Sequence, residues 1–182
     1  MQDTQVNLVS LTDENRNTFI EDLSRHLSSY FSNNIPENYG FSKPWSLLSL
    51  IKDGLIDTYQ LLYVDGEFWA GSGGIVRELN GRKVYQAAFR GFSNAGNRNP
   101  SLGQKFYLHK YNTVFQISRA KELGCKSVVL SFNEHNYRLF RITNDIILPK
   151  SGLDGLFVPT DQRIMFNGVP QWLLVMDIDH AS

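Results

Sequence analysis

The sequence predicts an α+β fold, in which a mixed and mostly antiparallel sheet with one parallel pair is flanked by helices. Three dipeptides, Asp65-Gly66, Asn80-Gly81 and Asn167-Gly168, each lie between strand-like runs. Such dipeptides favour the two-residue turns of β-hairpins. A long helical pattern separates the strand that ends near residue 89 from the strand at residues 127–132. A helical crossover makes two such strands parallel when they are neighbours.

The composition is that of one globular domain. A length of 182 residues allows one sizeable core but hardly two, so we expect a single domain over residues 1–182. The 18 basic and 18 acidic residues cancel, so no overall charge attracts nucleic acid or an anionic membrane. No stretch has the pattern of a secretory signal or the length of a membrane span. We therefore expect a cytoplasmic protein.

The first third of the chain predicts a strand, a helix and an irregular connection. Residues 6–11 alternate between apolar and polar side chains, as in a short strand, and Thr12 suits the cap of the helix that follows. Residues 35–57 are irregular, with a second short helix near Ser46. Aromatic residues at 39–45 indicate either a lid over a pocket or ordinary packing of the connection.

Three strands of an antiparallel meander are predicted at residues 59–64, 67–79 and 82–89. Three glycines interrupt the middle strand: Gly71, Gly73 and Gly74. They indicate a bulge, or a surface that another part of the backbone or a ligand approaches closely.

A polar loop at residues 97–103 leads into a long amphipathic helix. Asn99 suits the cap of this helix, Pro100 its first position and Gly124 its left-handed end. The apolar side chains predicted to face the sheet are those of Tyr107, Tyr111, Val114, Phe115, Ile117, Ala120 and Leu123. The side chains predicted to face solvent are those of Lys110, Asn112, Gln116, Arg119, Lys121 and Glu122. The amino end of such a helix offers N–H donors to a phosphate, although most helix ends bind only water.

The last third of the chain predicts a buried strand, a short helix and a hairpin. Cys125 is the only cysteine, so no internal disulfide can form, and we expect a small core residue rather than a nucleophile. A polar turn at residues 133–136 follows the strand, and Asn133 suits the cap of a short helix there. Pro170 indicates an edge or a bulge in the final strand.

The order of these elements, together with two short motifs, resembles the GNAT N-acetyltransferase superfamily. In the loop Arg98-Asn99-Pro100-Ser101-Leu102-Gly103, Arg98 and Gly103 match the ends of the family's pyrophosphate loop, and Ser101 stands where the first Gly is expected. The segment from Leu130 to Asn136 resembles the end of the family's fifth strand and the Asn that opens the next helix. The resemblance implies a GNAT-like acyl-CoA N-acyltransferase fold.

The resemblance also implies that acetyl-CoA is the co-substrate, without a metal, and that its acetyl group passes directly to a primary amine. Backbone amides of residues 98–103 would hold the pyrophosphate, and the strand near residues 89–92 would pair with the pantetheine arm. The residues expected to bind the cofactor are Phe89, Gly91, Phe92, Arg98, Asn99, Ser101, Leu102, Gly103, Asn133 and Asn136.

The chain departs from the family pattern where a general acid is expected. Many members place a tyrosine seven residues after the helix-opening Asn, and Thr143 occupies that position here. The tyrosine gives a proton to the leaving thiolate, so its absence puts catalysis in question. His135 and Tyr137 are the nearest titratable substitutes. The span from Gly103 to Gly124 is also several residues longer than the family usually has.

Three functions stay open at this point. The first is acetyl transfer to an amine, for which Glu67, Glu78 and Tyr85 are undistinguished candidates for the general base. The second is a catalytically inactive GNAT-like binding or assembly module, and the third is a transferase that uses an acyl-carrier protein. The partners implied by the first are a small-molecule or peptide amine acceptor and a possible second copy in a homodimer, with neither nucleic acid nor membrane.

Overall fold

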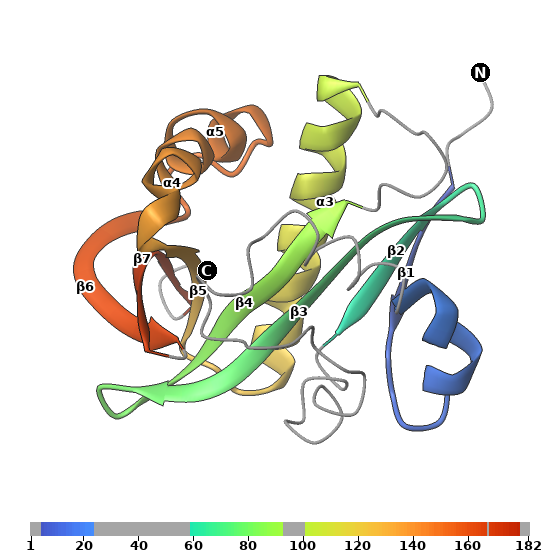
Figure 1. Ribbon diagram of the computed structural model, residues 1–182, viewed down its shortest axis with the longest axis horizontal. Coiled ribbons are helices and arrows are strands. Elements are labelled where there is room, and N and C mark those ends of the chain that lie inside the picture. The colour runs from blue at the N-terminus through green and yellow to red at the C-terminus, as the bar shows by residue number, and fades with distance from the viewer. Residues whose placement is uncertain (1–4, 24–58, 93–100, 167, 179–182) are drawn as a thin grey trace. The chain divides into compact units, whose positions relative to one another are not determined.

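The computed structural model of the chain describes residues 5–23, 59–92, 101–166 and 168–178 (Figure 1). The predicted helix near Ser46 and the aromatic residues at 39–45 lie outside these described residues.

Within the described residues, seven strands form a mixed sheet in the order β1-β2-β3-β4-β5-β7-β6. The strands are β1 (Val6–Ser10), β2 (Gln60–Val64), β3 (Glu67–Leu79), β4 (Arg82–Phe92), β5 (Ser127–Asn133), β6 (Val158–Phe166) and β7 (Val169–Asp177). Strands β4 and β5 are parallel, whereas β1–β2, β2–β3, β5–β7 and β6–β7 are antiparallel pairs. The predicted mixed sheet with a parallel pair is confirmed.

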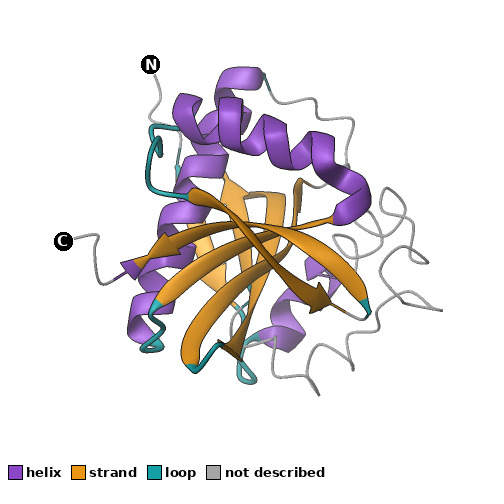
Figure 2. Cartoon of the chain, turned by 90° about the vertical axis from the view of Figure 1, so that its left-hand side faces the viewer, coloured by secondary structure: helices purple, strands orange, loops and turns teal. Residues whose placement is uncertain are grey.

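The described helices and strands, which Figure 2 colours by type, follow one another in the order that the sequence predicts. A helix begins at residue 16 and is described as far as residue 23. Helix α3 (Leu102–Glu122) connects β4 to β5. After β5 come a 3-10 turn (Glu134–Asn136), α4 (Tyr137–Ile142), a π-helical turn (Thr143–Ile147) and α5 (Leu148–Lys150).

The predicted hairpin turns are confirmed by their backbone angles. Asp65 and Asn80 have φ values of 50° and 52°, and Gly66 and Gly81 have φ values of 79° and 73°. Two successive positive φ angles define the type I′ turn, which matches the twist of the strands it connects. Gly168, in the third predicted turn, has a φ of 78°.

The chain divides into two compact units, each with its own packing. The first consists of Met1–Glu37, Phe41–Ile75 and Ala88–Arg98, and the second of Asn38–Gly40, Val76–Ala87 and Asn99–Ser182. The strands β1 and β2 and most of β3 belong to the first unit, whereas α3, β5 and everything after them belong to the second.

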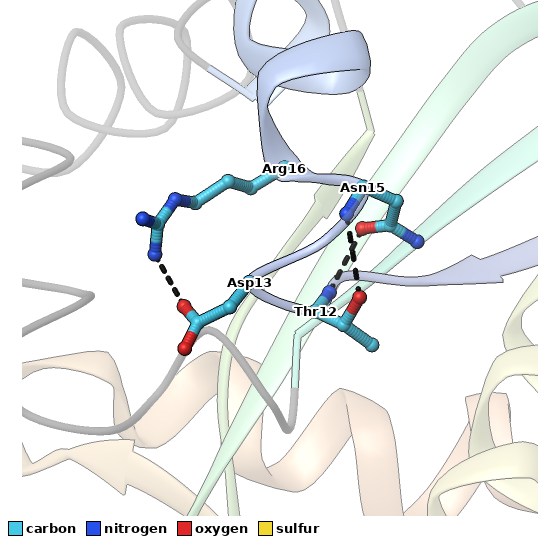
Figure 3. Close-up of polar contacts among 4 residues, drawn as sticks. All are labelled: Thr12, Asp13, Asn15 and Arg16. Carbon is cyan, nitrogen blue, oxygen red and sulfur yellow. Dashed lines mark hydrogen bonds and ion pairs between the residues drawn. The ribbon is translucent and has the colours of Figure 1, made fainter.

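In the first unit, polar contacts fix the start of the helix that begins at residue 16 (Figure 3). The Thr12 N–H donates to Asn15 Oδ1 at 2.8 Å, and the Asn15 N–H donates to Thr12 Oγ1 at 3.4 Å. This reciprocal pair satisfies N–H groups at the helix start, and an ion pair between Arg16 and Asp13 lies beside it. Thr12 therefore caps the helix, as predicted.

The middle strand of the meander carries both a bulge and a close approach. Leu62 pairs with Ala70 and the next residue, Tyr63, pairs with Phe68, so β3 has one extra residue, Trp69, opposite β2. The ring of Tyr59 lies against Gly73, where an added Cβ would be 2.5 Å from Tyr59 Cδ2. The bulge that the glycines indicated thus lies at Trp69, and the close approach at Gly73 comes from a tyrosine ring.

The second unit packs its helices on one face of β4, β5 and β7. Buried side chains of these strands contact those of α3, α4 and α5 in one cluster, and its largest members include Tyr85, Ile117, Val128, Leu130, Phe140, Leu148, Leu174 and Met176. The opposite face of the strands carries a smaller cluster of Val84, Val129, Ile164 and Leu173. The unit therefore has one sheet face that is covered by helices and one that is not covered by a described helix.

Helix α3 buries only part of the predicted face: Ile117 and Ala120 are buried as predicted, but the other residues of its buried face differ from the prediction. Tyr107, Tyr111 and Val114 are exposed, with 54%, 37% and 46% of their surface accessible. The buried residues of the helix are Leu108, Asn112, Thr113, Gln116, Ile117 and Ala120. The predictions that Asn112 and Gln116 face solvent and that the two tyrosines face the sheet were wrong. The prediction assumed that the buried face of the helix is the one with most apolar residues. The buried face instead contains three polar side chains.

The final hairpin accommodates Pro170 without an edge strand. Strand β7 lies between β5 and β6, and its pairing with β5 ends at Asn133 and Gln171. Pro170 is the next residue and pairs only with Met165 of β6. The register shift of this hairpin lies in β6, between Thr160 and Ile164. Pro170 thus occupies a position where the side of β7 toward β5 needs no ladder hydrogen bond.

Candidate functional site: the ends of α3 and β5

The amino end of α3 is closed in part by its own side chains. Ser101 is the cap residue, and its N–H donates to Gln104 Oε1 at 2.9 Å while the Gln104 N–H donates to Ser101 Oγ at 3.3 Å. The predictions of Asn99 as the cap and Pro100 as the first helical residue were therefore wrong. A polar side chain three residues into the helix reached back to Ser101 and formed a capping box.

Two N–H donors remain at this helix end. In the described part of the chain, no acceptor takes the N–H of Leu102 or Gly103. No acidic residue lies in the first turn, and an added Cβ at Gly103 would come no closer to a neighbouring atom than 4.0 Å from Ser101 Oγ. The helix dipole and these donors favour an anion, and nothing described around Gly103 obstructs one.

The carboxyl end of β5 lies in the same unit as the amino end of α3. Strands β4 and β5 pair in parallel from Val84 and Ser127 to Ala87 and Leu130. Strand β5 then continues for three more residues, to Asn133. Those three residues stay paired with β7, as Asn133 is with Gln171.

Aromatic side chains gather where β5 meets α4. Phe132, Tyr137, Phe140 and Trp172 have ring centroids 4.8 to 5.8 Å apart in four contacting pairs. The Trp172 N–H donates to the carbonyl oxygen of Glu134 at 3.3 Å, which ties β7 to the 3-10 turn. This aromatic cluster fixes the position of Tyr137, which is 45% exposed.

Tyr137 is linked to charged groups on α4 and the turn after it. A hydrogen bond with Tyr137 and one with Asp145 stabilise the guanidinium and raise the pKa of Arg141. Because arginine can only donate, the Tyr137 oxygen accepts this bond and its O–H can still donate. Hydrogen bonds from Asn144 and Arg141 lower the pKa of Asp145.

The other predicted residues of the turn lie apart from these charged groups. His135 is exposed, with Nε2 3.8 Å from Glu134 Oε1. Asn133 is buried and its Oδ1 accepts the N–H of His135 at 2.9 Å, so it caps the 3-10 turn, whereas Asn136 precedes α4 without a side-chain cap bond. Thr143, where the family tyrosine was expected, is buried.

Several predicted cofactor residues stay untested predictions. Arg98 and Asn99 lie outside the described residues, and Phe89, Gly91 and Phe92 belong to the part of β4 assigned to the first unit. Their positions in the backbone of β4 are described, but their side chains are not.

The sequence interpretation missed a line of polar side chains on the sheet face opposite the helices. The Arg77 guanidinium (Nη1) donates to Gln86 Oε1 at 2.9 Å, and Gln86 Nε2 donates to Ser131 Oγ at 2.9 Å. This polar line crosses β3, β4 and β5, and Gln86 is only 1% exposed. Gln86 and Ser131 each lie between apolar neighbours within their strands, and that interruption was the signal that could have identified them.

The candidates for a general base do not lie on this line. Tyr85 is fully buried in the cluster that packs against the helices, on the other face of β4 from Gln86. Glu78 is exposed next to the Asn80-Gly81 turn, and Glu67 is exposed in the first unit.

The single cysteine lies in the core of the second unit. Cys125 is a free, buried cysteine, and burial raises the pKa of its thiol. The prediction of a core residue is confirmed. Among the described residues, no group of three His, Cys, Asp or Glu could hold a metal ion, and no described helix is long and apolar enough to cross a membrane.

No protein-family model matches the sequence, and no curated protein matches it either. Solved structures do match over nearly the whole chain. FeeM, an N-acyl amino acid synthase from uncultured soil microbes, is 9% identical with a TM-score of 0.59, and the match covers 98% of this chain and 93% of FeeM. An acetyltransferase of the GNAT family from Listeria monocytogenes is 15% identical with a TM-score of 0.57, with 94% of each chain covered.

A third structure extends the same likeness. The yncA protein of Salmonella typhimurium, solved with its cofactor acetyl-CoA, is 11% identical with a TM-score of 0.55, and the match covers 96% of this chain and 95% of yncA. Identities this low concern the fold and leave the chemistry open. The element order, the parallel pair of β4 and β5 and these matches together show that the chain has the GNAT acyl-CoA N-acyltransferase fold.

Proposed function

We propose that the chain is an N-acetyltransferase that moves the acetyl group of acetyl-CoA to a primary amine within a ternary complex. The observation that carries the proposal is the amino end of α3, where the N–H groups of Leu102 and Gly103 have no described acceptor. Two donors at the positive end of a 21-residue helix suit the pyrophosphate of coenzyme A. The fold shared with yncA, whose cofactor is acetyl-CoA, supports the same assignment.

In this proposal, the first turn of α3 holds the cofactor. Leu102 and Gly103 donate their N–H groups to the pyrophosphate, and the Ser101 hydroxyl, which already accepts the Gln104 N–H, donates its own proton to it. Arg98 and Asn99 complete the phosphate loop, and the β4 backbone at Phe89–Phe92 pairs with the pantetheine arm. Asn133 at the end of β5 and Asn136 before α4 are assigned contacts with the cofactor in this proposal.

The chemistry is an amide-forming acyl transfer. The amine nitrogen attacks the thioester carbonyl carbon, so a C–N bond forms and the C–S bond breaks. The amine gives up one proton, and the departing thiolate takes one, so that the products are an N-acetyl amine and free coenzyme A. Tyr137 is the better-placed proton donor of the two candidates, because its ring packs against Trp172 and Phe140, whereas His135 is exposed in the 3-10 turn.

Coenzyme A binding tests this assignment directly. Gly103→Glu places a carboxylate at the proposed phosphate site, where an added Cβ meets no close neighbour and an acid in the first turn is compatible with the helix. We expect this variant to raise the Kd for coenzyme A by about tenfold or more in isothermal titration, since repulsion of about 1.4 kcal/mol suffices. Val114→Glu is the matched control, because it puts the same charge on an exposed position further along α3.

Two outcomes would reject the assignment. One is the absence of binding heat for the unaltered chain at millimolar coenzyme A. The other is equal weakening by both variants, which would mean that overall charge rather than the helix end determines binding. A cytoplasmic location, a single domain and a homodimer remain predictions alongside this proposal.

A catalytically inactive GNAT-like module is the second candidate, favoured by one specific observation. Thr143 occupies the position of the family tyrosine and is buried, so it cannot serve as a general acid. Release of free thiol from acetyl-CoA in the presence of a broad panel of amines would exclude this candidate. Coenzyme A binding without thiol release would favour it.

A further inference from the structure

Arg77 places a positive charge on the sheet face opposite the helices. Its side chain is half-buried, and its one hydrogen bond in the described part of the chain goes to the side-chain oxygen of Gln86. That acceptor is neutral. A guanidinium has five N–H donors, so this bond leaves most of its donors available.

Arg82 lies on the same face of the sheet, on the neighbouring strand β4, and forms an ion pair within the protein. Arg82 Nη2 lies 3.1 Å from Asp177 Oδ1, and the same carboxylate oxygen accepts the Ser127 hydroxyl at 2.9 Å. Arg82 thus has a carboxylate partner from β7. No described residue supplies such a partner to Arg77.

The surroundings of Arg77 hold its guanidinium in place. Gln86 is 1% exposed, and its amide is oriented from the other side by the bond to Ser131 Oγ. Both polar atoms of the Gln86 amide are hydrogen-bonded, so the oxygen that accepts from Arg77 is held in place. The remaining N–H donors of the Arg77 guanidinium are therefore restricted in orientation. A planar guanidinium presented in this way matches a carboxylate, which it can bind through two parallel hydrogen bonds.

Two of the three strands that carry the polar line, β4 with Gln86 and β5 with Ser131, form the parallel pair, whereas Arg77 lies on β3. Gln86 and Val129 are in register, and Ser131 is two residues further along β5, just past the last pair between β4 and β5. The polar line ends at Ser131, two residues before the end of β5, in the same unit as Tyr137 but on the opposite face of the sheet from the cluster against which Tyr137 packs.

We propose that the amine acceptor of this chain carries a carboxylate, which Arg77 binds while Gln86 holds the guanidinium in position. The inference rests on the proposed acetyl transfer and names the substrate class for that site. Amino acids and related small amino carboxylates are the expected acceptors, and uncharged amines of the same size are the poor ones.

The test compares matched pairs of acceptors with the full-length chain. Each pair consists of an amino carboxylate and its amide, such as glycine with glycinamide, β-alanine with β-alaninamide and leucine with leucinamide. Thiol release from acetyl-CoA gives kcat/KM for each member. We expect the carboxylate to be preferred in at least one pair, and Arg77→Gln to reduce that preference about 10- to 100-fold, the usual effect of losing hydrogen bonds to a charged group.

Two variants separate binding from folding. Arg77→Lys keeps the charge but not the planar fork, so it should retain part of the preference. Arg82→Gln removes an arginine from the same face that is already paired with Asp177, so the acid-to-amide preference should stay unchanged. The ratio between pair members cancels any general loss of active protein in a variant.

The outcomes distinguish this inference from the proposed function. Equal use of acids and amides, or a preference that Arg77→Gln leaves intact, overturns the inference while acetyl transfer stands. If coenzyme A binds without turnover, the same amino carboxylates are titrated into the loaded chain. Binding heat that is lost in Arg77→Gln but kept in Arg82→Gln supports the inference. The absence of binding heat in the unaltered chain overturns it. If coenzyme A does not bind, the proposed function fails first.

Discussion

Replacing Gly73 with alanine should destabilise the first unit because the space beside it is filled by a buried ring. The new Cβ would be 2.5 Å from Tyr59 Cδ2 and 3.0 Å from Cε2. Carbon atoms pack best at about 3.5 to 4.0 Å, so the ring would have to retreat by about 1 Å. Tyr59 has no exposed surface, so the ring cannot move into solvent.

The expected loss follows from two opposing terms. Overfilling a packed site costs about 1 to 3 kcal/mol, whereas exchanging glycine for alanine in a strand recovers about 0.5 to 1 kcal/mol of backbone entropy. We expect a net loss of about 1 to 2 kcal/mol in the free energy of unfolding. In urea titrations followed by circular dichroism, this lowers the midpoint by about 0.5 to 1 M at a slope near 2 kcal/mol/M.

A double-mutant cycle identifies the ring as the cause. Tyr59→Ala removes the three ring carbons that crowd the new methyl group. In that background Gly73→Ala should be neutral or slightly stabilising, so the two substitutions should couple by about 1 to 2 kcal/mol. Equal destabilisation in both backgrounds would refute the steric explanation, and so would an unchanged midpoint for Gly73→Ala alone.

Three further measurements examine other parts of the structure. Ser101→Ala removes the oxygen that accepts the Gln104 N–H and should lower stability by about 1 kcal/mol in urea titrations, whereas an unchanged midpoint would show that the capping box contributes nothing. Cys125 should react with a thiol reagent at pH 8 only after unfolding, because burial raises the pKa of its thiol, and rapid labelling of the folded chain would contradict this. Asp145→Asn should lower the urea midpoint at pH 7, because the hydrogen bonds that lower the pKa of Asp145 below 3.8 stabilise the folded chain. This stabilisation is present above pH 3.8 and is lost as the pH falls through the folded-state pKa. A difference between the two proteins that persists at pH 2 would contradict that sign.

The turns and the parallel pair could be predicted from the sequence because local chemistry determines them. Asp65-Gly66 and Asn80-Gly81 adopt the positive φ angles that these residue pairs tolerate, whatever the rest of the chain does. The connection through α3 then makes β4 and β5 parallel by a general rule of chain topology.

The orientation of α3 could not be predicted because tertiary packing overrides its pattern of apolar residues. The exposed rings of Tyr107 and Tyr111 lie tilted toward each other, with centroids 6.2 Å apart, and Gln116 has no exposed surface. A count of apolar positions assigns such a helix the wrong face, since it cannot recognise a buried amide that has a partner.

The part of the candidate site that could be predicted is the part formed by backbone groups at the start of α3. Gly103 and the start of α3 follow from short motifs, although the cap proved to be Ser101. Arg77 and Gln86 were missed because their importance lies in a contact between strands and in the lack of a described carboxylate partner. Neither property is visible in the order of residues along one strand.

The polar inward face of α3 has a consequence for how the second unit reaches its final arrangement. Asn112, Thr113 and Gln116 are buried beside Leu108 and Ile117, and none of the three polar residues lacks a partner. A helix with an inward face of apolar side chains alone could turn slightly about its long axis with little loss, whereas these three residues would lose the partners that they have. The helix therefore has one rotational setting on the sheet, which fixes where the N–H groups of Leu102 and Gly103 lie around the helix axis.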